Sequence, residues 1–429
     1  DNIPYTPKHH LPISLNGVKE EDFTMVFGFP GSTNEYLPSS EVRFIKDVLN
    51  PIRINIREEK MNVLKSAMSK DPATRIKYAS KYARLTNYYK KWKGENMGLK
   101  QTGAIKKKEK EEKKLASWTK ATGKYLNVFE SLESFYDKSH SFELSLNVCY
   151  EAGLGIDLIY FSYLFNRFID LYEHTGLDLE GRTLLKEKYL KRFKKLYKDF
   201  DKKTDKALAN TLLPIMVESL DKINIKKDNA FLISSDIFSK SLTPYIEKLY
   251  SKSFLADSTN TFNLIKNYKS KKSKKDIGIK AGRTISSLLY NIRSKYIPIA
   301  DSIDYYQGKY MNALIDLNKG KTFYSDANST LRIAYGKVEP YKPKDGVNFH
   351  YQTYTSGILE KNTSGEKDYY LSEKLKSIYK NKDFGRYGIN GVLPVCFIAS
   401  NHTTGGNSGS PVINAKGELI GLNFDRNWE

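Results

Sequence analysis

Ser408 lies in a glycine-rich turn whose composition suits a nucleophile. Residues 404–411 read Thr-Gly-Gly-Asn-Ser-Gly-Ser-Pro, and the apolar residues Val412 and Ile413 follow. Glycine lets the backbone fold tightly enough for two amides, those of Gly406 and Ser408, to point into one small space. If the Ser408 hydroxyl attacks a carbonyl, each amide stabilises the oxyanion by roughly 3 kcal/mol. A glycine-rich hairpin loop has the same composition, so the turn alone leaves both interpretations open.

A serine nucleophile needs a general base, normally a histidine that a carboxylate orients. His402 precedes Ser408 by six residues, and a short loop can hardly bring its ring onto the hydroxyl. We therefore do not assign it as the base. The remaining histidines are His9, His10, His140, His174 and His350.

The sequence around Ser408 contains more than a lone serine turn. Residues 401–411 read Asn-His-Thr-Thr-Gly-Gly-Asn-Ser-Gly-Ser-Pro, and residues 419–429 read Leu-Ile-Gly-Leu-Asn-Phe-Asp-Arg-Asn-Trp-Glu. These two motifs, at this spacing, resemble the bacterial dipeptidyl-peptidase family of chymotrypsin-clan serine peptidases, serine peptidase family 46. Less sharp matches extend over the whole chain, at residues 7–14, 28–33, 87–92 and 329–338.

The resemblance implies that Ser408 is the nucleophile and that the amides of Gly406 and Ser408 form the oxyanion hole. In this family the catalytic His lies in a His-His-Cys-Gly motif and the Asp follows it. His9 and His10 are instead followed by Leu11 and Pro12, so they match a different stretch of the family and are assigned a structural role. We expect the catalytic His and Asp before Asp1, in a chain that is a fragment lacking both ends and nearly inert alone.

The resemblance also implies which residues bind the peptide. Arg426 matches a position at which members with Gly take apolar residues and members with Arg, the dipeptidyl-peptidase 11 type, take Asp or Glu. A guanidinium there can hold a carboxylate by two parallel hydrogen bonds. Asp425 and, with looser alignment, Asn87 match positions that hold the free α-amino group. The alternatives are a surface Arg426 paired with Asp425 or Glu429, Asp425 as a salt bridge at a strand end, and Asn87 as an ordinary helix residue.

The elements that must position these residues change in character along the chain. In residues 1–36, Phe23, Met25 and Phe27 alternate with Thr24 and Val26, which predicts a strand before the turn at residues 28–31. Residues 37–328 show helical spacing, as in residues 52–68, 154–172 and 184–196, with breakers at Pro51, residues 71–72, residues 94–98, Gly123, Gly176 and Gly282. Alternation returns in residues 329–429, which predicts a β domain around Ser408.

The resemblance turns this pattern into a fold. It implies a chymotrypsin-like double β-barrel with a large inserted α-helical cap domain. Residues 1–36 would then end the first part of the peptidase domain, and residues 329–429 would form the second barrel. The helical domain would cap the cleft and limit the product to two residues. The predicted activity is a serine dipeptidyl aminopeptidase that releases N-terminal dipeptides with Asp or Glu second.

The strongly positive net charge is also compatible with a nucleic-acid-binding function. The 429 residues include 70 Lys and Arg against 49 Asp and Glu, a net charge of +21, and 31 tyrosines that could stack on bases. A basic helical nucleic-acid-binding protein is therefore the rival interpretation, although residues 106–114 mix both signs as an exposed helix does. An inactive, peptide-binding homologue is the third.

Other expectations concern compartment and partners. Cys149 and Cys396 lie in apolar surroundings and predict buried thiols rather than a disulfide framework. No apolar segment approaches twenty residues, so we expect no membrane insertion. The resemblance implies peptide substrates with a free N-terminus, no nucleic acid, no cofactor, no metal, a homodimer, and a periplasmic or exported location in a Gram-negative bacterium.

Overall fold

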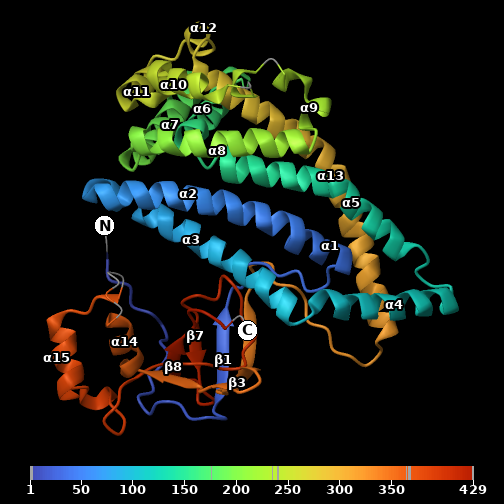
Figure 1. Ribbon diagram of the computed structural model, residues 1–429, viewed down its shortest axis with the longest axis vertical. Coiled ribbons are helices and arrows are strands. Elements are labelled where there is room, and N and C mark those ends of the chain that lie inside the picture. The colour runs from blue at the N-terminus through green and yellow to red at the C-terminus, as the bar shows by residue number, and fades with distance from the viewer. Residues whose placement is uncertain are drawn as a thin grey trace. The chain divides into compact units, whose positions relative to one another are not determined.

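The computed structural model describes residues 3–174, 176–233, 235–238, 241–363, 365 and 369–427. It is a mixed helical and β structure that divides into two compact units (Figure 1). The first unit, which we call the peptidase unit after the family resemblance, combines Asp1–Tyr36 with Thr322–Glu429, and the second, the helical unit, is Leu37–Lys321. The second boundary lies earlier than the predicted one at residue 328, because the last helix ends at Leu317 and the following segment joins the strands.

The helical unit is built from helices that range from 4 to 41 residues in length. They are α1 (Ser39–Phe44), α2 (Asn50–Lys70), α3 (Pro72–Gln101), α4 (Ala104–Thr122), α5 (Val128–Val148), α6 (Asp157–His174), α7 (Leu179–Lys198), α8 (Lys202–Lys222), α9 (Ile225–Asp228), α10 (Leu242–Lys252), α11 (Ser258–Lys266), α12 (Ser270–Ser273) and α13 (Ile277–Leu317). Two π-helical turns, Ile45–Leu49 and Cys149–Gly153, follow α1 and α5. The helical periods at residues 52–68, 154–172 and 184–196 are thus confirmed by α2, α6 and α7.

The core of the helical unit is centred on α6, whose phenylalanines are buried on several sides. Phe161, Phe165 and Phe168 are at most 1% exposed. The first two pack edge-on against Phe193 of α7, and Phe168 packs against Tyr189 of α7 at a tilt of 53°. Figure 1 shows α13 running along the unit, and it packs against both α5 and α6. A smaller cluster joins α4, α5 and the C-terminal half of α13.

Glycine was a good predictor of helix ends only where its φ is positive. Gly123 and Gly176 have φ of +68° and +63° and lie where α4 and α6 end. The prediction that residues 94–98 and Gly282 end helices is wrong, because α3 and α13 continue through them. At Gly282 a Cβ would lie 2.3 Å from the Ser162 carbonyl, so this glycine lets α13 approach α6 closely.

The peptidase unit contains the predicted strands and two helices that were not predicted. Strands β1 (Phe23–Gly28), β2 (Arg332–Lys337), β7 (Pro411–Ile413) and β8 (Leu419–Leu422) form an antiparallel sheet in the order β2-β1-β7-β8. The strands β3 (Tyr341–Lys344) and β4 (Val347–Phe349) pair, as do β5 (Gln352–Tyr354) and β6 (Pro394–Phe397). None of the described sheets closes on itself. Helices α14 (Thr355–Asn362) and α15 (Glu373–Asn381) interrupt the region predicted to be β throughout.

The strand at Phe23–Gly28 is confirmed, but its buried face is not the aromatic one. Thr24 and Val26 are buried, whereas Phe23 is 38% exposed in this chain. Thr24 is buried because it belongs to a hydrogen-bond network, which we call the Asn401 lock. In it the Thr24 hydroxyl donates to Asn401 Oδ1 at 2.6 Å, and Asn401 Nδ2 donates to the Ala334 carbonyl at 3.0 Å. This lock fixes the start of the segment that leads to Ser408.

Among the described residues, no single helix combines the length and apolar character needed to cross a bilayer. The segments Val128–Gly153 and Asp157–His174 satisfy these criteria only as a pair, and the pair is bent by 111°. Both contribute buried residues to the core of the helical unit.

Candidate active site

The turn that carries Ser408 is held by the side chain and backbone of Asn407. Asn407 is 3% exposed; its Oδ1 accepts the Thr404 N–H at 3.0 Å and its carbonyl accepts the Ser410 N–H at 2.9 Å. Its own N–H donates to the Thr404 carbonyl at 3.1 Å. A buried residue held by these bonds directly before Ser408 fixes the backbone that carries the hydroxyl. Asn407 was missed as a positioning residue, although it belongs to the quoted motif.

The two amides predicted to form an oxyanion hole donate no hydrogen bond to the described protein atoms. Within the part of the chain that the structure describes, neither the Gly406 N–H nor the Ser408 N–H donates to a protein atom. Gly406 has a φ of +108° and Gly409 a φ of +83°, so the turn uses conformations that glycine adopts readily. Both amides are therefore available to an external oxygen, as the chemistry of an acyl transfer requires.

A second glycine turn, residues 28–31, packs directly against the first. The Gly31 N–H donates to the Gly405 carbonyl at 2.7 Å. A Cβ on Gly28 would lie 2.3 Å from Asn407 Nδ2, and a Cβ on Gly406 would lie 2.4 Å from the Phe29 carbonyl oxygen. The two glycine motifs, far apart in the sequence, thus depend on each other for close backbone contact.

The Ser408 turn is also tied to the segment after β8. The Gly409 N–H donates to the Asn423 carbonyl at 2.7 Å, and Ser408 Oγ lies 3.5 Å from the Phe424 carbonyl oxygen. Ser408 is exposed, as a hydroxyl that attacks a substrate must be. Arg426 follows Phe424 by two residues, which an extended chain spans in at most roughly 7 Å. Ser408 and Arg426 therefore lie at the same end of the peptidase unit.

Asp425 and Arg426 are both exposed. Asp425 Oδ1 accepts the backbone N–H of Arg426 at 2.9 Å, while the Arg426 guanidinium has no hydrogen-bond or ion-pair partner among residues 3–427 that are described. The alternative pairing with Asp425 is thus not formed, and Glu429 lies outside the described residues. An exposed guanidinium with no partner in the described part of the chain can bind a carboxylate.

The remaining predicted residues are placed as follows. The His402 ring stacks edge-on against Tyr324, with centroids 5.2 Å apart, and has no hydrogen bond to Ser408 in the described chain. Asn87 lies on the exposed side of α3 in the helical unit, and its side chain makes no hydrogen bond to a described residue. Its role toward a peptide stays a prediction. The described residues hold no group of three or more His, Cys, Asp or Glu that could bind a metal.

A family model described as Peptidase S46 matches residues 1–429. The chain belongs to this peptidase family. The S46 chain is 39% identical over 438 residues to the Asp/Glu-specific dipeptidyl-peptidase of Flavobacterium psychrophilum, covering 100% of this chain and 60% of that protein. It is 34% identical over 444 residues to dipeptidyl-peptidase 7 of Phocaeicola vulgatus, with the same 100% and 60% coverage.

The structure of the S46 chain resembles that of a solved relative. The crystal structure of Porphyromonas endodontalis DPP11 in complex with the dipeptide Arg-Glu matches with a TM-score of 0.86 and 29% sequence identity. The match covers 100% of this chain and 61% of the solved one. The chain thus spans about three fifths of the length of its relatives, 60% of the first two curated proteins.

Proposed function

We propose that the protein is a serine dipeptidyl peptidase that removes N-terminal dipeptides whose second residue is Asp or Glu. Ser408 Oγ attacks the carbonyl of the second residue, and the free amides of Gly406 and Ser408 stabilise the oxyanion. The amine leaves, and water then hydrolyses the acyl-enzyme. The observation that carries the proposal is the pair of unoccupied amides around an exposed serine in an S46 chain.

The base and its carboxylate partner are proposed to come from outside residues 1–429. Six histidines occur in the chain, and His402, the one nearest to Ser408 in sequence, stacks on Tyr324 instead. The proposal therefore concerns the longer protein, of which this chain supplies the nucleophile and part of the substrate site.

Arg426 is proposed to bind the acidic side chain of the second residue. Its guanidinium, which has no partner among the described residues, and its closeness to Ser408 through Phe424 support this role. Relatives named Asp/Glu-specific dipeptidyl-peptidase, at 39% and 37% identity, agree with it. We further propose that Asp425 and Asn87 hold the α-amino group.

Finer features of the fold and setting are also proposed. They are a chymotrypsin-like double β-barrel with the helical unit as an inserted cap, a homodimer, and a periplasmic or exported location. The antiparallel sheet β2-β1-β7-β8, formed by strands on both sides of the helical unit in sequence, supports the inserted arrangement. Membership of the family supports the rest.

The proposal is tested by covalent labelling of the full-length protein with a fluorophosphonate. The reagent should attach to Ser408, as located by mass spectrometry, and Ser408→Ala should abolish both labelling and dipeptide release. Ser410→Ala, which removes the other serine of the same turn, should keep the label. Failure of Ser408 to react, with no dipeptide release from the unmodified protein, would instead favour an inactive peptide-binding homologue.

A further inference from the structure

An open cavity of about 310 Å³ lies in the helical unit, between α2, α3, the π-helical turn Cys149–Gly153, the start of α6 and α8. Such a volume is at the lower end of the range for small-molecule sites. Its lining belongs wholly to residues 57–208, and Asn87 is not part of it. Nothing proposed above for peptide hydrolysis uses this cavity, so the inference below stands apart from that function.

The lining carries more positive than negative charge. Four cations, Arg57, Lys60, Lys81 and Arg84, face two carboxylates, Glu151 and Asp157. Both carboxylates are already paired. Arg57 binds both oxygens of Glu151 at 2.7 Å, and Lys81 Nζ lies 2.6 Å from Asp157 Oδ2.

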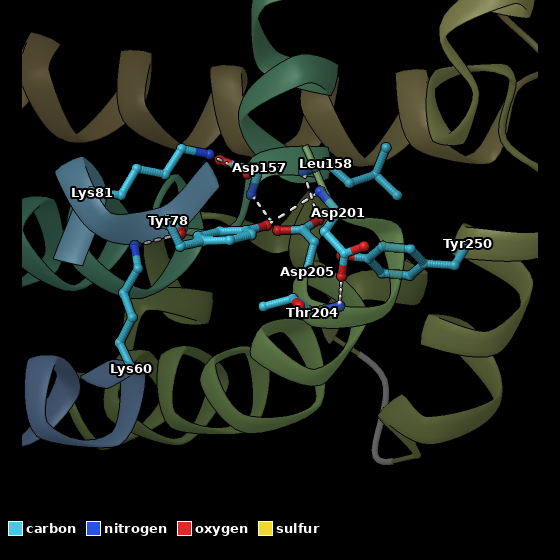
Figure 2. Close-up of polar contacts among 10 residues, drawn as sticks. Lys60, Tyr78, Lys81, Asp157, Leu158, Asp201, Thr204, Asp205 and Tyr250 are labelled. Atoms are coloured by element: carbon cyan, nitrogen blue, oxygen red, sulfur yellow. Dashed lines mark hydrogen bonds and ion pairs between the residues drawn. The ribbon is translucent and has the colours of Figure 1, made fainter. Parts of the chain in front are cut away.

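Lys60 and Arg84 are left without a carboxylate partner in the described chain. Lys60 Nζ donates to the Gly155 carbonyl at 2.5 Å, a single acceptor for an ammonium with three N–H groups. Figure 2 shows Lys60 reaching toward the same region as Tyr78, Lys81 and Asp157. Burial lowers the pKa of Lys60, and the Asp157 and Glu151 carboxylates only partly oppose this. A bound anion would therefore satisfy a charge that the protein leaves under-bonded.

The backbone beside the cavity includes an unusual, π-helical conformation. The π-helical turn carries Tyr150 and Glu151 into the lining, and such turns are frequent at functional sites. At Gly155 a Cβ would lie 2.1 Å from the Glu151 carbonyl oxygen and 3.0 Å from Lys60 Nζ. A side chain at this position would displace the ammonium, so glycine preserves the approach to Lys60.

The rest of the wall suits an apolar or aromatic body. Tyr88 and Tyr150 line the cavity together with leucines, and Arg57 lies 5.0 Å from the Tyr88 ring centroid. We propose that the cavity binds a small anion with an aromatic or apolar body and one carboxylate or phosphate group, to which Lys60 and Arg84 donate hydrogen bonds.

The test uses three probes that share a phenyl ring: phenyl phosphate, phenylacetate and the uncharged 2-phenylethanol. Isothermal titration calorimetry on the whole chain, at fixed ionic strength, should show binding of at least one anion and none of the alcohol. If phenyl phosphate binds more tightly than phenylacetate, the ligand carries a phosphate group; the reverse order of affinity indicates a carboxylate. Absence of binding by both anions, or equal binding of the alcohol, contradicts the proposal.

Variants locate the binding. Arg84→Gln, at an exposed and unpaired position, should weaken the anion by at least about tenfold, since a hydrogen bond to a charged group is lost. Lys60→Met should do the same if it folds. Arg75→Gln, an exposed arginine of the same helix outside the cavity, should bind as the unmodified chain does. Unchanged affinity in Arg84→Gln, or an equal loss in Arg75→Gln, overturns the assignment.

Discussion

Gly406→Ala should damage both the stability of the peptidase unit and its catalytic turn. The Cβ would lie 2.4 Å from the Phe29 carbonyl oxygen and 2.7 Å from the Gly31 nitrogen, both backbone atoms that cannot rotate away. The φ of +108° is a second obstacle, because residues with a Cβ rarely adopt it. The turn must therefore shift away from residues 28–31.

The size of the effect follows from these two costs. An unfavourable φ costs roughly 1 to 3 kcal/mol, and forcing an atom into a packed contact costs roughly 1 to 3 kcal/mol more. We expect a loss of about 2 to 6 kcal/mol in the unfolding free energy. If the shift turns the Gly406 N–H away from the oxyanion, kcat should also fall by about 100- to 1000-fold.

Urea unfolding and dipeptide release by the full-length protein measure the two effects. Gly405→Ala is the matched control, because nothing lies within 4 Å of its Cβ position and its φ is not in the positive range. It should change the unfolding free energy by less than about 0.5 kcal/mol. Equal stability of Gly406→Ala and Gly405→Ala would refute the packing argument, and normal kcat in Gly406→Ala would refute the role of its amide.

Three further predictions concern buried groups. Burial, followed by the Asp157 carboxylate, raises the pKa of Asp205 from 3.8 to about 7, so the folded chain holds a proton that the unfolded chain has lost. The stabilising contribution of this proton is complete below about pH 4 and is lost as the pH rises through 7. The difference in unfolding free energy between the unmodified chain and Asp205→Asn should therefore shrink from pH 5 to pH 8. A difference that stays constant over this range refutes the prediction. Burial raises the pKa of the Cys149 thiol to about 12, so iodoacetamide should label the half-exposed Cys396 and leave Cys149 unmodified in the folded chain. Gly282→Ala should lower the unfolding free energy by roughly 1 to 3 kcal/mol, because its Cβ would clash with the Ser162 backbone. Gly308→Ala in the same helix should not lower it, because nothing lies within 4 Å of that Cβ position. Equal effects of the two substitutions would contradict the close contact at Gly282.

The sequence predicted individual helices and strands better than their packing. Alternation found β1, and helical spacing found α2, α6 and α7, because these signals are local. The buried face of β1 could not be read from alternation, since Thr24 is buried through a hydrogen bond to Asn401, which is distant in sequence. The same limit explains why the prediction of a helix end at Gly282 is wrong. This glycine is needed because α13 packs closely against Ser162 of α6, which is distant in sequence.

The candidate site shows the same division. Composition singled out the Ser408 turn and its two amides, and neither amide donates a hydrogen bond to a described residue. The roles of Asn407 and Gly28 depend on contact between two turns far apart in sequence, for which no periodicity exists. The cavity at Lys60 was also beyond sequence reasoning, because it needs residues of four helices, α2, α3, α6 and α8, and of a π-helical turn to meet.

The most direct test is the substrate preference of the full-length protein with and without Arg426. The ratio of kcat/KM for a Leu-Asp over a Leu-Leu fluorogenic substrate should be about 100 or more, because two hydrogen bonds to a charge are each worth roughly 1.5 to 3 kcal/mol. In Arg426→Gly the ratio should fall to about 1 or below, through loss of the Leu-Asp rate. Equal turnover of both substrates by the unmodified enzyme, or an acidic preference that survives in Arg426→Gly, would contradict the account.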